Sequence, residues 1–69
     1  MKAANDNTPR LIAMKDASAM TSMSRTLILA LMREGRFPQS VQLGERRYAF
    51  VRAEVVAWID AKISGRASA

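Results

Sequence analysis

This chain must fold without covalent or metal cross-links. It has 69 residues and contains neither cysteine nor histidine. A chain of this length buries only about 60% of the surface that its unfolded form exposes, so its stability depends on a small apolar core. The missing cysteines exclude disulfides and thiolate metal sites, and they fit a reducing, cytoplasmic compartment. The missing histidines remove the commonest general base. We therefore expect one small domain that binds a partner, with no enzymatic activity, no metal and no cofactor.

The positive charge is concentrated in the middle of the chain. Eleven Lys and Arg residues against six Asp and Glu residues give a net charge of +5. Residues 10–52 carry eight of these cations and three of the carboxylates, so this segment holds the whole excess. Clustered positive charge attracts polyanions such as nucleic acid over about a Debye length, although a solvated basic surface is an equally good explanation of charge alone. No apolar run approaches the roughly 18 residues that a membrane span needs.

The best-defined helix lies between Ser24 and Gly35. Ser24 is a good N-cap because its hydroxyl can accept from a free backbone N–H, and Gly35 is the expected residue just past the C-terminal end. At 100° per residue, one arc of about 140° collects the apolar core stripe. This predicted stripe consists of Leu27, Ile28, Leu31 and Met32. The opposite, exposed arc holds Arg25, Thr26, Leu29 and Arg33. Leu29 is thus a large apolar residue at a position expected to face water.

Shorter elements flank this helix. Residues 11–14 are either a short strand or an extended lead-in, residues 15–20 predict under two turns of helix, and residues 21–24 have a turn composition. Two runs that alternate in hydrophobicity around Gly44 predict a β-hairpin. Its predicted inward face consists of Val41, Leu43, Tyr48 and Phe50. A last helix is expected from about residue 52 to residue 63, with apolar residues four apart. These are Val55, Ile59 and Ile63.

The order of these elements predicts an α+β fold, a winged helix-turn-helix with three helices and a two-stranded β-hairpin as the wing. The predicted domain spans residues 10–65, between disordered tails at 1–9 and 66–69. A helix-turn-helix inserts its second helix into the major groove of DNA, and a basic hairpin suits phosphate or the minor groove. The candidate DNA-binding residues are Ser24, Arg25, Thr26, Leu29, Arg33, Arg36, Arg46 and Arg47.

Several of these candidates have a simpler structural explanation. Ser24 can be a helix cap only. Arg33 can be a charge favoured by the helix dipole, and Arg36 can cover the ring of Phe37. Leu29, placed to touch a thymine methyl group, can equally belong to a protein contact. A protein-interaction module with little DNA binding is therefore the alternative of a different class.

Several motifs, with their spacing, resemble the AlpA group of small phage-type regulators, which is related to excisionases and to MerR-type DNA-binding domains. The resemblance covers about residues 10–63. Its motifs are Arg10-Leu11-Ile12, Thr21-Ser22-Met23-Ser24-Arg25, Arg33-Glu34-Gly35-Arg36-Phe37-Pro38, Val41-Gln42-Leu43-Gly44, Arg46-Arg47 and Glu54-Val55-Val56-Ala57-Trp58-Ile59. The family usually has glycine where Ser22 stands, and threonine, an aromatic and a basic residue where Leu27, Leu29 and Ala30 stand.

The resemblance implies a DNA-binding protein of a mobile genetic element. Its expected function is that of an excisionase, a recombination directionality factor, with transcription regulation as the close alternative. The expected partners are double-stranded DNA, an integrase or recombinase, and neighbouring copies that bind cooperatively. Because the middle of the predicted recognition helix is apolar, we expect affinity to come mostly from phosphate contacts and sequence specificity to be modest.

Overall fold

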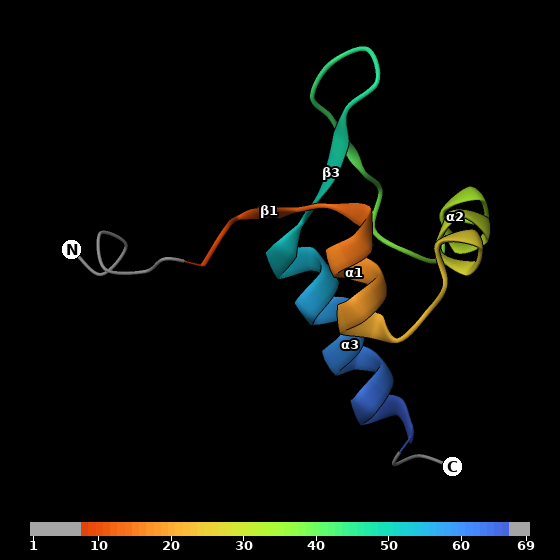
Figure 1. Cartoon of the computed structure of the whole chain (residues 1–69). Coiled ribbons are helices and arrows are strands. Elements are labelled where there is room, and N and C mark those ends of the chain that lie inside the picture. Colours follow the sequence, from red (N-terminus) through yellow and green to blue (C-terminus); the bar gives the residue numbers. More distant parts are fainter. Residues whose placement is uncertain (1–7, 67–69) are drawn as a thin grey trace.

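Three helices and three short strands make up the described part of the chain, residues 8–66 of a computed structural model (Figure 1). In chain order they are β1 (Leu11–Ile12), α1 (Met14–Thr21), α2 (Arg25–Arg33), β2 (Val41–Gln42), β3 (Tyr48–Val51) and α3 (Arg52–Arg66). This α+β arrangement confirms the predicted winged helix-turn-helix. Most of both predicted tails, residues 1–7 and 67–69, lies outside the described residues.

The sheet has three antiparallel strands, with β3 in the centre, β1 on one side and β2 on the other. Residues 11 and 12 are therefore a strand that pairs with the wing hairpin, which is the first of the two possibilities that the sequence left open. The sheet passes directly into α3. The backbone N–H of Arg52 donates to the carbonyl of Arg10 at 2.8 Å, so the start of α3 is fixed to the chain entering β1.

The register of the hairpin differs from the predicted one. Val41 is paired with Ala49, and Gln42 is paired with Tyr48. Residues directly opposite each other share a face, so Val41 lies on the face of the sheet opposite to that of Tyr48 and Phe50. The predicted inward face, which combined Val41 and Leu43 with Tyr48 and Phe50, was therefore wrong by one residue of register. Val41 and Leu43 are exposed, while Phe50 is fully buried.

The core contains one buried cluster to which most of the elements contribute. Its members are Ile12, Ala17, Ile28, Phe37, Phe50 and Val55. Phe37 is the only one of these that lies outside a helix or strand. Its ring packs edge-on against Phe50, at 5.7 Å between centroids, and against Trp58, at 5.0 Å. Phe37 thus joins the segment after α2 to both β3 and α3.

Local signals set both ends of α2, as predicted. The Ser24 hydroxyl accepts from the backbone N–H of Leu27 at 3.1 Å. At the other end Gly35 has φ +73°. Its N–H donates to Met32 O at 3.0 Å, and the N–H of Arg36 donates to Leu31 O at 2.8 Å. This pair of bonds is a Schellman motif, which needs a left-handed residue at the position of Gly35.

The last helix is longer than predicted. It continues through Ser64 and Gly65 to Arg66, three residues beyond the expected end. Val55 is buried and Ile59 is half-buried, as the four-residue spacing predicted. Ile63 is 52% exposed, because the last turns of α3 extend away from the sheet (Figure 1).

The turn between α1 and α2 contains a strained residue. Ser22 has φ 62° and ψ 26°, and it is the only non-glycine residue with positive φ in residues 8–66. The hydroxyl of the preceding Thr21 donates to Ala17 O at 2.8 Å and accepts from the N–H of Met23 at 3.3 Å. These bonds hold a left-handed conformation that serine adopts at a cost and glycine adopts freely.

Replacing Ser22 by glycine should stabilise the domain. We expect Ser22→Gly to raise the free energy of unfolding by up to about 1 kcal/mol, because the left-handed strain outweighs the extra freedom of glycine in the unfolded chain. Urea unfolding followed by the fluorescence of Trp58, the only tryptophan, measures the change.

Ser40→Gly is the matched control, because Ser40 does not have a positive φ. There the same substitution should lower stability by roughly 0.5 kcal/mol through chain entropy alone. Equal effects at the two sites would contradict the interpretation of Ser22 as strained.

Candidate nucleic-acid interface

The first turn of α2 presents a polar and cationic surface. Ser24, Arg25 and Thr26 are all exposed, and the turn carries no acidic residue. The hydrogen bond that the N–H of Leu27 donates to the Ser24 hydroxyl confirms that Ser24 is a cap. The first backbone bond at this end is donated by Ile28 to Ser24 O at 3.0 Å. Of the backbone N–H groups before that point, the one of Leu27 is bonded to the Ser24 hydroxyl, and the others have no partner within the helix and favour an anion.

The exposed leucine of α2 is Leu27, and this corrects the predicted pattern. Leu27 was placed in the core stripe but is 45% exposed, whereas Leu29, expected to face water, is half-buried. Ile28 is the fully buried residue of the helix. Leu27 lies at one edge of the predicted 140° arc and in the first turn, so the core reaches Ile28, Leu31 and Met32 but leaves Leu27 partly uncovered. Arg33, in the last turn, is exposed as predicted.

The wing loop, residues 43–47, carries two further arginines. The backbone N–H groups of Leu43 and Gly44 both donate to Arg47 O, at 2.8 and 3.2 Å, which closes the loop. Arg46 and Arg47 are exposed, and Glu45 lies beside them, so the loop has a net charge of +1. The loop projects from the sheet in the direction opposite to that of α3 (Figure 1).

Arg36 differs from the other candidate arginines. Its guanidinium Nη1 lies 3.3 Å from Glu34 Oε1, which balances part of its charge. Within residues 8–66, Arg25, Arg33, Arg46 and Arg47 form no ion pair. These four side chains are therefore free to neutralise phosphates.

Residues 34–40, the tethered segment, connect α2 to the wing and are held by two hydrogen bonds. The indole N–H of Trp58 donates to Arg36 O at 2.8 Å, and the side-chain amide of Gln39 donates to Met32 O at 3.1 Å. These bonds fix how the chain leaves α2 and enters β2. The structure thus places Arg25, Thr26 and Arg33 on α2 and Arg46 and Arg47 on the wing, two outlying elements connected by a tethered segment (Figure 1).

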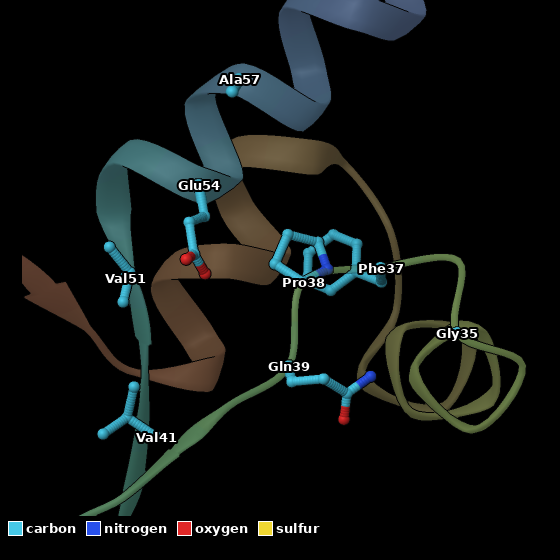
Figure 2. Close-up of a pocket in the computed structure, with 8 residues that line it drawn as sticks. All are labelled: Gly35, Phe37, Pro38, Gln39, Val41, Val51, Glu54 and Ala57. Atoms are coloured by element: carbon cyan, nitrogen blue, oxygen red, sulfur yellow. The ribbon is translucent and has the colours of Figure 1, made fainter.

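A shallow hollow lies elsewhere, between the tethered segment, the end of β3 and the first turns of α3 (Figure 2). Its lining is mostly apolar and includes Pro38, Val41 and Val51. Glu54 supplies the only charged side chain, and Figure 2 shows its carboxylate directed into the space between Val51 and Pro38. A carboxylate repels phosphate, so the hollow is not part of the surface suited to nucleic acid.

Residues 8–66 offer neither a metal site nor a membrane-spanning helix. Among His, Cys, Asp and Glu, this part of the chain has only Asp and Glu. No three of these acidic side chains lie close enough together to hold a metal ion. No helix in it has the length and hydropathy that a membrane crossing requires.

A capped helix after a tight turn, followed by a basic hairpin, defines a small DNA-binding protein of the winged helix-turn-helix class. The comparisons with known proteins agree. Residues 10–63 match the family described as "Prophage CP4-57 regulatory protein (AlpA)", and the chain belongs to this family of phage-type DNA-binding regulators. The match covers most of the described domain, from β1 into α3.

One curated relative adds to this result. It is "Uncharacterized protein ORF88" of Enterobacteria phage P4, which is 35% identical over 57 residues. The match covers 83% of this chain and 65% of the relative, so the chain spans less than two thirds of that protein. No solved structure matches the chain significantly.

Variants of Ser24 separate its role as a cap from contact with DNA. Ser24→Ala should lower the free energy of unfolding by about 1 kcal/mol, because the N–H of Leu27 loses its partner. Ser24→Asp keeps a capping oxygen and should retain the stability of the wild type. Thermal unfolding by circular dichroism measures both.

The order of the two variants in affinity for duplex DNA, measured by gel shift, should be the reverse of their order in stability. Ser24→Asp adds a negative charge at the end of the helix and should bind more weakly than the less stable Ser24→Ala. If Ser24→Asp binds as well as the wild type, the N-terminal end of α2 does not approach phosphate.

Proposed function

We propose that this protein binds duplex DNA of a mobile genetic element and acts there as an excisionase, a recombination directionality factor. The observation that carries the proposal is the set of exposed, unpaired arginines on α2 and on the wing. Arg25 and Thr26 contact phosphate or base edges from the first turn of α2, and Arg33 contacts the backbone. Arg46 and Arg47 follow phosphate or enter the minor groove, where the negative potential favours arginine.

The remaining candidates have smaller roles in this proposal. Ser24 caps the helix and presents backbone N–H groups to a phosphate. Arg36, paired with Glu34, contributes less than the four unpaired arginines. Leu29 is half-buried, so only the exposed part of its side chain can contact DNA.

The size of the protein favours cooperative binding. A single domain of this kind covers a small area of duplex and binds weakly by itself. Neighbouring copies on adjacent sites would raise the affinity, and proteins that coat and bend an attachment site for a recombinase work in this way. Leu11 and Val41 are 40% and 37% exposed and lie on the sheet face opposite to that of Phe50. They offer apolar surface for a second copy or an integrase while α2 and the wing face DNA.

Transcription regulation without a direct role in recombination is the second candidate. The matched family is described as a regulatory protein, which favours it. Both functions need the same fold and the same charged surface, and one protein can perform both. The two candidates differ in whether the protein changes the product of an integrase.

Binding to duplex DNA should depend steeply on salt. If the four unpaired arginines each neutralise one phosphate, log K should fall against log salt with a slope of about −3.6. Arg25→Ala and Arg46→Ala should each weaken binding and reduce the steepness by about 0.9. Fluorescence anisotropy between 50 and 200 mM salt, roughly the range over which such contacts are lost, measures the slopes.

Arg66→Ala is the matched control for this measurement. It removes the same charge from the far end of α3, which points away from the wing (Figure 1). Its slope should stay close to that of the wild type. An equal effect of all three substitutions would mean that net charge, and not the surface of α2 and the wing, determines binding.

The excisionase proposal has its own test. Purified protein, added to the integrase and the attachment-site DNA of its element, should promote excision, and footprinting should show contiguous protection over repeated sites. Arg25→Ala should lose both effects together. DNA binding without any effect on recombination would leave transcription regulation as the function.

A further inference from the structure

We infer that Leu27 is a specificity-determining residue that contacts the 5-methyl group of a thymine in the major groove. The inference rests on the proposed function and adds to it the kind of base that the recognition helix selects. It starts from the exposure of Leu27, 45%, beside a neighbour, Ile28, that is completely buried.

The position of Leu27 in α2 is the first support. It is the third residue of the helix, in the turn whose side chains reach base edges when a recognition helix enters the major groove. Its own N–H is bonded to the Ser24 hydroxyl, which fixes the backbone from which the side chain projects. The backbone that carries this exposed side chain therefore has a defined position in the first turn of α2.

The surroundings of Leu27 favour DNA over a protein as its partner. Arg25 and Thr26 precede it, both are exposed, and the turn carries no carboxylate. A turn of this charge attracts phosphate and does not repel it. The apolar group that a base pair presents in the major groove is the methyl group of thymine, which leucine can cover.

The other exposed leucine near the proposed DNA surface does not share this position. Leu43 is 50% exposed but lies in the wing loop, beside Gly44. A wing that enters the minor groove meets no thymine methyl group, because that group lies in the major groove. Leu43 is therefore the matched control for Leu27.

The test compares thymine with deoxyuridine, which differs only by the missing methyl group. The full-length wild type selects duplexes from a random-sequence pool, and each thymine of the selected duplex is then replaced by deoxyuridine. At one position, the replacement should lower the affinity of the wild type about four-fold, which is the change expected when the burial of one methyl group is lost. Leu27→Ala should bind the two duplexes equally, while Leu43→Ala and the conservative Leu27→Met should keep the four-fold difference.

Each other outcome overturns a different statement. If the wild type enriches a sequence but no thymine is sensitive, or if Leu27→Ala keeps the difference, the inference about Leu27 is wrong and DNA binding stands. If the wild type binds duplexes without enriching any sequence, the inference about Leu27 is likewise wrong and DNA binding stands. If Leu27→Ala instead changes the sedimentation of the free protein and leaves the thymine difference intact, Leu27 belongs to a protein contact. If the wild type does not bind duplex DNA, the proposed function itself is wrong.

Discussion

The packing of Phe37 between Phe50 and Trp58 is the contact on which the arrangement of this domain depends. Phe37 is 4% exposed and stands just after the C-terminal cap of α2. Pro38 disfavours a helical conformation at Phe37, so the helix does not resume there, and the ring of Phe37 lies in the core. Each edge-on aromatic pair adds about 0.5–1.5 kcal/mol beyond its burial, which is a large share of the stability of a small domain. The same contact fixes where the wing begins relative to α2.

Local chemistry explains why much of the fold could be predicted from the sequence. The cap at Ser24, the glycine at position 35 and the proline at 38 act within a few residues of themselves, and they place α2 and the extended segment correctly. The left-handed turn at Ser22 could also be anticipated from the resemblance to the AlpA group, in which glycine usually stands at this position. The exposed arginines could be found because charged side chains are rarely buried without a partner.

Features that depend on tertiary contacts could not be predicted in the same way. The alternation around Gly44 is compatible with two registers, and only the pairing of Val41 with Ala49 decides between them. Position on a helical arc does not show that the first turn of α2 lies partly beyond the core, so Leu27 and Leu29 were assigned to the wrong environments. The extension of α3 past Ile63 has the same cause, since a pattern of apolar residues does not show where the packing partner ends.

The distribution of charge and apolar surface then constrains how the domain can work. Unpaired arginines occupy α2 and the wing, whereas the carboxylate of Glu54 faces the hollow of Figure 2. The opposite signs suit the arginine-bearing elements, and not the hollow, to the binding of a polyanion. Arginine contacts with phosphate carry no sequence information, so sequence selection must come from the few side chains that reach base edges. In the proposed interface, the first turn of α2 adds Thr26 and Leu27 to Arg25, and Leu27 suits the methyl group of thymine better than a hydrogen-bonding base edge. Under the proposed function, affinity comes from charge, modest selectivity comes from shape and apolar contact, and cooperative binding by neighbouring copies is the step that would let so small a domain occupy a site fully.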